Sequence, residues 1–166
     1  MTFIFDVNKE YHAGANLTDK FLCLETYSGL GRYSSDPDYP CQLLSIDSDD
    51  VCIGHELLQA LKNSRTYTPE ESEEYLSLEK TQVEYDEWVT VLMAKYNYRT
   101  RRALFKNMKY CSIICVNNII KIQPTRHTKL EGWSWAGHDK DVIRLPVTSE
   151  PEKIGSALRQ AFECCD

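Results

Sequence analysis

The sequence predicts an α+β fold, with helices packed against a mainly antiparallel sheet, and three observations support this class. The predicted strands come in groups instead of alternating with helices, which argues against parallel βαβ units. Two β-rich runs flank Asn117 and Asn118, whose tolerance of positive φ suits a hairpin turn. Three further segments carry apolar residues at helical spacing. Because the 166 residues contain no linker-like stretch, we expect a single domain spanning residues 1–166.

The first third of the chain predicts two strands separated by a loop. The run at 21–26 is mostly apolar and bounded by turn residues, and the run at 41–46 is a second strand or an extended approach to a helix. The stretch TYSGLGRYSSDPDYP at 26–40 has the Gly, Ser, Asp and Pro content of a loop. Its glycines open no helix and are followed by aspartates that would repel phosphate. A turn is therefore favoured over a nucleotide-binding loop.

The middle of the chain predicts helices. Residues 47–64 begin with aspartates that suit a helix N-terminus and continue with leucine and isoleucine at helical spacing. Residues 68–97 form the longest helical region, in which Thr68 and Glu71 match a capping box. A short helix is expected at 100–107.

The C-terminal third predicts a hairpin, a loop, a strand and a final helix. The hairpin joins runs on either side of Asn117 and Asn118, and the polar segment 127–141 is expected to be a loop. A strand is expected at 142–147. The helix at 149–165 is expected to begin at a Ser149 cap paired with Glu152.

Composition restricts the classes of function. The formal net charge of −6 disfavours direct nucleic-acid binding and suits a basic partner. Seven cysteines without a Cys-x-x-Cys pair indicate reduced thiols, most of them in apolar runs. No signal-peptide pattern opens the chain, and no apolar run is long enough to span a membrane. These features predict a cytoplasmic protein without membrane contact.

No residue pattern makes a strong case for catalysis, a cofactor or a metal. His127 and His138 share a segment with Asp139 and Asp141, but two tryptophans there suit a contact surface better than a metal site. Cys115 and His127 are of the residue types that a cysteine hydrolase uses as nucleophile and base. Cys115, however, lies in an apolar run typical of a core. We therefore predict no catalytic, cofactor-binding or metal-binding residue. A small hydrolase or nuclease using Arg126 and His127 is the alternative, and a structural subunit of a larger assembly is a third possibility.

Charge is distributed unevenly along the chain. Residues 70–87 hold eight acids and one lysine, residues 36–50 add five aspartates, and residues 98–110 carry five basic residues and no acid. Tyrosines lie among the acids, and aromatics beside charges are typical of binding surfaces. The pattern fits either a solvated acidic face or a surface that attracts a cationic protein.

Several stretches together resemble the CdiI immunity proteins of bacterial contact-dependent growth inhibition (CDI). They are, in order along the chain, LETYSGLGRYSSDPDYPCQLLSIDSDD, IGHELLQALKNSR, YRTRRALFKNMKYCSI, IKIQPTRHTKLEGW and PEKIGSALRQAFECC. The resemblance spans about Leu24 to Cys165 and rests on the joint order of the stretches, because none of them is a catalytic motif.

The resemblance implies a cytoplasmic protein that binds and blocks the C-terminal toxin domain of a CdiA protein. Such a toxin domain is often a nuclease, and a nuclease that grips phosphates is expected to be basic. It implies no contact map, so the predicted toxin-binding residues come from the acids and their neighbouring aromatics. The main predicted set is Asp36, Asp38, Tyr39, Glu70, Glu71, Glu73, Glu74 and Tyr75. A second predicted patch is Trp133 and Trp135, which share a side of an extended segment or fold down onto the sheet.

Overall fold

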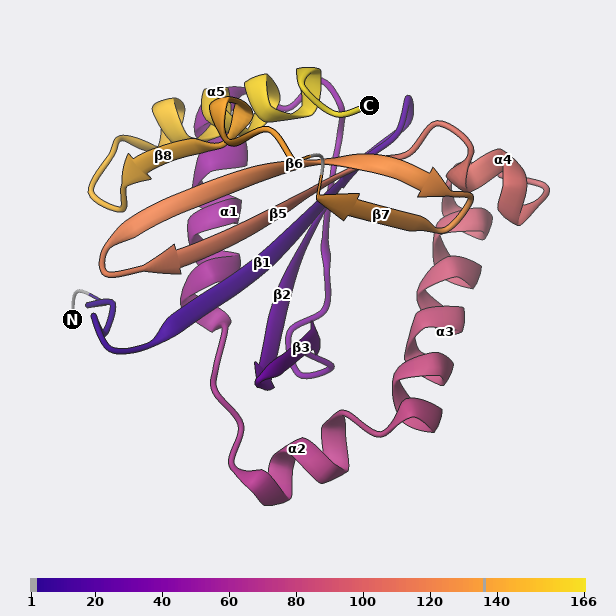
Figure 1. The fold of residues 1–166 in the computed structure, drawn as a ribbon. Coiled ribbons are helices and arrows are strands. Elements are labelled where there is room, and N and C mark those ends of the chain that lie inside the picture. Colours follow the sequence, from indigo (N-terminus) through magenta and orange to yellow (C-terminus); the bar gives the residue numbers. More distant parts are fainter. Residues whose placement is uncertain (1–2, 136) are drawn as a thin grey trace.

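A computed structural model describes residues 3–135 and 137–166 and confirms the α+β class with an antiparallel sheet (Figure 1). Within these residues the sheet has eight strands in the order β3-β2-β1-β5-β6-β7, with β4 paired to β2 and β8 paired to β6. The strands are β1 (Glu10–Leu17), β2 (Leu22–Leu30), β3 (Arg32–Ser35), β4 (Gln42–Leu44), β5 (Lys109–Val116), β6 (Ile119–Lys129), β7 (Gly132–Trp135) and β8 (Ile143–Pro146).

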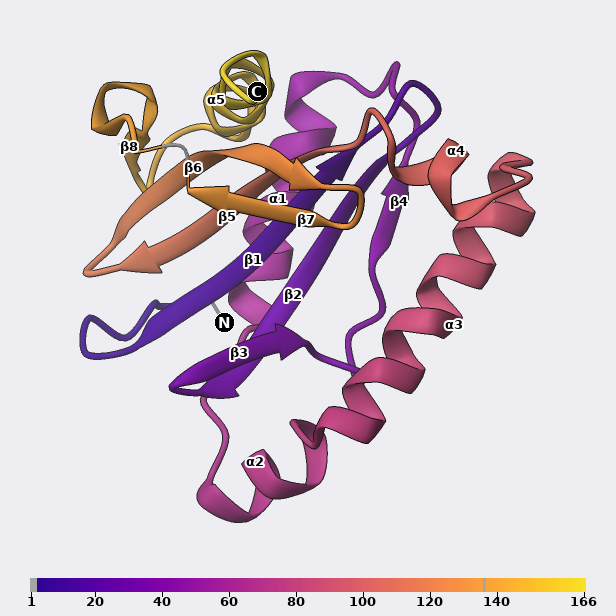
Figure 2. The same ribbon diagram turned by 45° about the vertical axis from the view of Figure 1, so that its right-hand side comes forward.

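The helices divide between two sides of this sheet. Figures 1 and 2 show α1 and α5 together on one face, whereas α3 runs along the opposite side of the molecule, past β2 and β4. The helical segments are α1 (Asp50–Asn63), α2 (Pro69–Tyr75), α3 (Leu78–Tyr96), α4 (Arg101–Phe105), the 3₁₀ turn η1 (Asp139–Asp141) and α5 (Pro151–Glu163). No helix in the described part of the chain is long and apolar enough to cross a membrane.

Alternation along the strands builds two cores, one on each face of the sheet. In β2, Leu22 and Leu24 join the core beneath α1 and α5. The intervening Cys23 joins the second core, which contains Phe21 and side chains from α3 and α4. Successive side chains of β2 point to opposite faces of the sheet, so every second residue after Cys23 faces α3, as Cys23 does.

The two helices α1 and α5 approach to backbone contact at two glycines. A Cβ atom on Gly54 would overlap the carbonyl oxygen of Pro151, and one on Gly155 would overlap that of Asp50. Both glycines are buried, so the close crossing depends on the absence of side chains there.

The loop that composition suggested at 26–40 is found only at 36–40, because residues 26–35 form part of a hairpin. Strand β2 continues through Leu30, Gly31 turns the chain at φ 75°, and β3 returns along β2. Strand β1 was also missed, because its Gly14 and Asn16 have low strand propensity. The apolar residues at alternate positions, Tyr11, Ala13 and Ala15, were the sequence signal available for β1, and all three are buried in the core.

The helix and turn predictions were mostly confirmed. Thr68 and Glu71 form the capping box, and Asn117 and Asn118 have the positive φ of the predicted hairpin turn. The region 68–97 is divided in two, because the chain leaves the helix at Leu76 and starts α3 with a Ser77 cap.

Two C-terminal predictions were wrong. The segment 127–141 is not all loop, because β6 extends to Lys129 and pairs with β7 across a tight turn. The Ser149 hydroxyl does not cap α5 but donates to the carbonyl oxygen of Pro146. The N-cap residue is Glu150, followed by Pro151 at the first helical position, where the missing N–H costs nothing.

Candidate functional site

A cavity of about 750 Å³ lies between the sheet and α3, lined by side chains from β1, β2, β3, β5, β7 and α3 and from the segment between β3 and β4. Four acids line it (Glu25, Asp36, Glu84 and Glu87), and no Lys or Arg is among its described lining residues. Seven aromatic residues also line it: Tyr27, Tyr33, Tyr39, Tyr85, Trp88, Tyr110 and Trp133. The cavity is thus both acidic and aromatic.

Strand β2 provides the floor of the cavity. Glu25 is buried, and the Ser35 hydroxyl donates to its carboxylate at 3.2 Å. Burial raises the pKa of Glu25 to about 7, although hydrogen bonds from Ser35 and Tyr27 oppose the shift. The Tyr27 side chain passes over Gly14 of the neighbouring strand, where a Cβ atom would overlap its ring. Gly14 therefore makes room for an aromatic floor.

Helix α3 provides the facing wall. Thr81, Glu84, Trp88 and Val91 recur at spacings of three and four residues, so one side of the helix faces the cavity. The helix is held at the β6–β7 turn by Tyr85, whose hydroxyl donates to Glu131 at 2.8 Å.

Arg101 strengthens this attachment of α3. Its guanidinium contacts Glu131 at 2.7 Å and Asp86 at 3.4 Å. Part of the basic segment 98–110 therefore neutralises acids of this chain.

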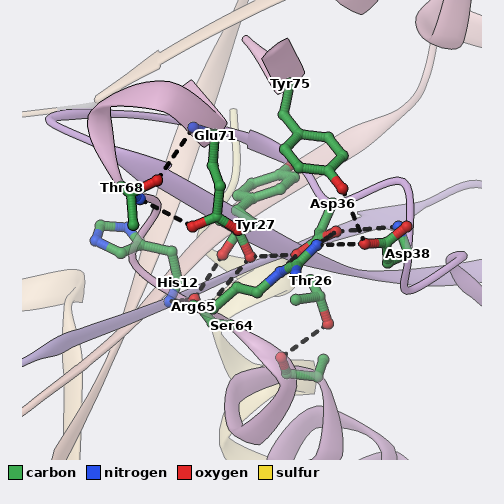
Figure 3. A network of polar contacts seen from close by, with 12 residues as sticks. His12, Thr26, Tyr27, Asp36, Asp38, Ser64, Arg65, Thr68, Glu71 and Tyr75 are labelled. Carbon is green, nitrogen blue, oxygen red and sulfur yellow. Dashed lines mark hydrogen bonds and ion pairs between the residues drawn. The ribbon is translucent and has the colours of Figure 1, made fainter. Parts of the chain in front are cut away.

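Four of the predicted toxin-binding residues converge on one side chain that the sequence analysis did not single out, Arg65. The Arg65 Nε atom contacts Asp36 at 2.7 Å, and its Nη2 atom contacts Asp38 at 2.6 Å (Figure 3). The Tyr75 hydroxyl reaches the same Asp38 carboxylate oxygen at 3.4 Å, and Tyr39 lies 5.7 Å from the guanidinium. These contacts join α2 and the end of α1 to the cavity rim.

Asp36 is the buried member of this cluster. Its side chain has no exposed surface and also accepts a hydrogen bond from the Ser28 hydroxyl at 2.7 Å. Burial alone would raise the pKa of Asp36, but the hydrogen bonds from Arg65 and Ser28 outweigh it and hold the pKa below its usual value. The carboxylate of Asp36 is thus occupied inside the protein.

The other predicted residues lie in two places. On α2, Glu70, Glu73 and Glu74 are exposed, whereas Glu71 accepts a hydrogen bond from the Thr68 backbone in the capping box. On β7, Trp135 is exposed, while Trp133 lines the cavity and donates from Nε1 to the carbonyl oxygen of Met108 at 3.0 Å.

The residues of the enzyme alternative do not converge. Arg126 and His127 are neighbours on β6, so their side chains leave opposite faces of the strand. His127 stacks on Trp133 with ring centroids 4.7 Å apart, and Arg126 lies 3.6 Å from the exposed Asp166 carboxylate. Cys115 is buried in the core under α1 and α5, where burial raises the pKa of its thiol to about 11.

The structure also brings together three residues whose grouping was not predicted. One ligand-type atom from each of Cys23, Glu25 and Cys41 lies within 4.8 Å of the others. All seven cysteines are free. Sequence spacing gave little sign of the group, because Cys41 comes from a different segment; only the Cys23-x-Glu25 alternation was visible.

The fold and the site define a small α+β protein with an acidic, aromatic binding cavity. The family model described as "CdiI: CDI immunity protein" matches residues 11–165. Immunity protein CdiI-YPIII of Yersinia pseudotuberculosis serotype O:3 (strain YPIII) is 38% identical, over 96% of this chain and 98% of the relative. The chain therefore belongs to the CdiI family of CDI immunity proteins, and it is not an enzyme.

Two solved structures share the fold over nearly the full length. A protein of unknown function, NMB0488 from Neisseria meningitidis, has a TM-score of 0.93 and 38% identity, covering 99% of this chain and 100% of that one. A chain of the CdiA-CT/CdiI toxin and immunity complex from Yersinia pseudotuberculosis has a TM-score of 0.88 and 35% identity, covering 97% of this chain and 100% of that one.

Proposed function

We propose that this protein binds the C-terminal toxin domain of its cognate CdiA in the cytoplasm and neutralises it as a stoichiometric complex. Membership of the immunity family supports this proposal, as does the similar fold in a toxin and immunity complex. The toxin is a basic nuclease in this proposal, because a protein that grips phosphates carries cationic surface that an acidic partner attracts.

The cavity between the sheet and α3 carries the proposal. Asp36 is already paired with Arg65, and burial raises the pKa of Glu25 to about 7. The cavity therefore owes its negative potential mainly to Glu84 and Glu87 on α3, which have no basic counterpart among the described lining residues. Its seven aromatics supply the large, desolvated contacts that dominate binding energy. The exposed acids of α2 lie beyond the rim and would guide the toxin toward it.

Filling the cavity is expected to abolish much of the binding. Val91 lines the cavity and is 55% exposed, so a Val91→Trp side chain has room to occupy the space without disturbing the core. We expect the Kd for the toxin domain to rise about 30-fold, a loss of roughly 2 kcal/mol. Calorimetric titration of the purified pair measures this change, and survival of toxin-expressing cells provides a second readout.

Val83→Trp is the matched control, because Val83 lies on the same helix with 52% exposure but does not line the cavity. It should bind like the wild type. Equal toxin affinity for Val91→Trp and the wild type would place the toxin elsewhere.

Reversing the exposed α2 acids is expected to slow association. The triple variant Glu70→Lys, Glu73→Lys and Glu74→Lys keeps Glu71, whose carboxylate is needed in the capping box. We expect the association rate constant to fall about tenfold at low salt and its salt dependence to flatten, because steering arises from long-range attraction. Stopped-flow mixing across a salt series measures both.

The same charge change on α5 is the control: Glu150→Lys, Glu152→Lys and Glu163→Lys alter three exposed acids there. If both triple variants slow association equally, the effect is one of net charge. If neither does, the α2 acids face solvent in the complex.

A further inference from the structure

We propose that Cys23, Glu25 and Cys41 form a binding site for a borderline-soft divalent cation of the Zn²⁺ class. Their two sulfur atoms and one carboxylate oxygen all lie within 4.8 Å of one another at the cavity floor. This inference concerns the immunity protein alone and goes beyond toxin binding.

The backbone holds the three donors in place. Cys23 and Glu25 are two residues apart on β2, so both side chains leave the same face of the strand. Cys41 immediately precedes β4, which is paired to β2 through the Cys23–Leu43 register. Cys23 and Glu25 are therefore fixed by a paired strand, and Cys41 is one residue away from one, which holds donors more precisely than a loop does.

The donor set selects the cation. Two thiolates and one carboxylate are ligands of Zn²⁺, whereas Mg²⁺ and Ca²⁺ require oxygen donors. Tetrahedral Zn²⁺ with bonds of about 2.3 Å to sulfur brings two sulfurs about 3.7 Å apart, which small side-chain movements reach from this arrangement. Glu25 and Cys41 both line the cavity, so the fourth position faces it and takes a water molecule.

The surroundings supply a hydrogen-bond partner for bound thiolates, and no described ion pair joins the group to a Lys or Arg, although Lys95 lies near enough to act on Cys41. Glu25 accepts hydrogen bonds from the hydroxyls of Ser35 and Tyr27. The Trp88 Nε1 atom is buried beside both thiols, close enough to donate toward them, but it makes no hydrogen bond of normal geometry in the described structure. An indole N–H of this kind stabilises a metal-bound thiolate from outside the ligand set.

Metal binding would join the segment before β4 to β2 across the cavity floor. Each thiol gives up its proton to solvent as its sulfur–metal bond forms. Because the site is formed by folded backbone, the cation binds the native state in preference to the unfolded chain. The protein should therefore unfold at a higher temperature when Zn²⁺ is present.

The test uses the full-length, reduced, chelator-treated protein without any toxin. Zn²⁺ is titrated in competition with a chromophoric chelator, and Co²⁺ is used to detect thiolate coordination by its charge-transfer absorption. We expect one equivalent per chain, at least about 100-fold weaker binding in Cys41→Ser and Glu25→Gln, and about tenfold weaker binding in Trp88→Phe.

Cys52→Ser is the control, because Cys52 lies on α1 outside the group and should bind like the wild type. Retained binding in Cys41→Ser would assign the metal elsewhere, such as the Cys111–Cys165 pair, whose sulfurs are 3.6 Å apart, and would overturn the proposal. Absence of Co²⁺–thiolate absorption would overturn it too, as would a Cys23–Cys41 disulfide in freshly isolated protein. None of these results depends on toxin affinity, so they stand apart from the test of the proposed function.

Discussion

Replacing Gly54 with alanine is expected to lower the free energy of unfolding by about 3 kcal/mol, because the new methyl group forces α1 and α5 apart. The atom it meets is the backbone carbonyl oxygen of Pro151, which cannot rotate away as a flexible side chain would. The gain in helix propensity from Gly to Ala, about 1 kcal/mol, offsets part of this cost. Gly155→Ala should behave alike, since its methyl group meets the carbonyl of Asp50.

Urea unfolding measures these losses, and Gly132→Ala provides the comparison. A Cβ atom on Gly132 would lie 3.3 Å from the Cβ atom of Lys129, a contact that a shift of a few tenths of an ångström relieves, so this variant should lose well under 1 kcal/mol. Wild-type stability in Gly54→Ala would mean that the two helices do not meet at this point in solution.

Replacing Arg65 with methionine is expected to cost about 3 kcal/mol of unfolding free energy at neutral pH. The substitution keeps most of the packing volume but leaves the Asp36 carboxylate buried without its partner. It also frees Asp38 and Tyr75, so the attachment of α2 should loosen. Chemical unfolding at several pH values measures the loss.

The pH dependence follows from the lowered pKa of Asp36. In the wild type, stability from this carboxylate is present above the usual aspartate pKa near 3.8 and is lost as pH falls through the lower folded value. Without Arg65, burial dominates and raises the pKa of Asp36. The variant then relieves its buried charge by taking up a proton. The stability difference from the wild type should therefore shrink as pH falls from 7 toward about 4.

Two further variants separate the buried pair from the exposed one. Asp38→Asn should cost less than about 1 kcal/mol, because the Asp38 side chain is 53% exposed. Asp36→Asn in the Arg65→Met background should recover part of the loss by removing the unpaired charge. An equal cost for Asp38→Asn and Arg65→Met, with no recovery, would contradict this account.

The charge pattern of the sequence predicted part of the grouping of these side chains, but not its cause. The pattern placed Asp36, Asp38, Tyr39 and Tyr75 in one group, and the structure does bring them together. Their common neighbour is Arg65 of the same chain, so their proximity does not by itself indicate a partner surface. Contact between the toxin and the ten residues of the two predicted sets stays a prediction. The cavity that carries the proposal includes Glu84 and Tyr85, which the sequence indicated only as members of the acidic run 70–87 and of the helical region 68–97.

Features that depend on neighbouring residues could be predicted from the sequence. The capping box of α2, the Asn117–Asn118 turn and the apolar faces of α1 and α5 were all predictable, because each is set by contacts within a few residues. The resemblance to CDI immunity proteins was also present in the sequence, since it rests on the order of whole stretches.

Contacts between distant segments across the sheet could not be predicted in this way. Strand β1 is held between β2, the next strand in the chain, and β5, whose residues lie about a hundred positions further on, and this pairing overrides its weak strand propensity. The cavity, the Arg65 cluster and the group of Cys23, Glu25 and Cys41 all arise where distant segments face each other. Strand register and helix packing fix those positions, and neither is encoded in the spacing of residues along one segment.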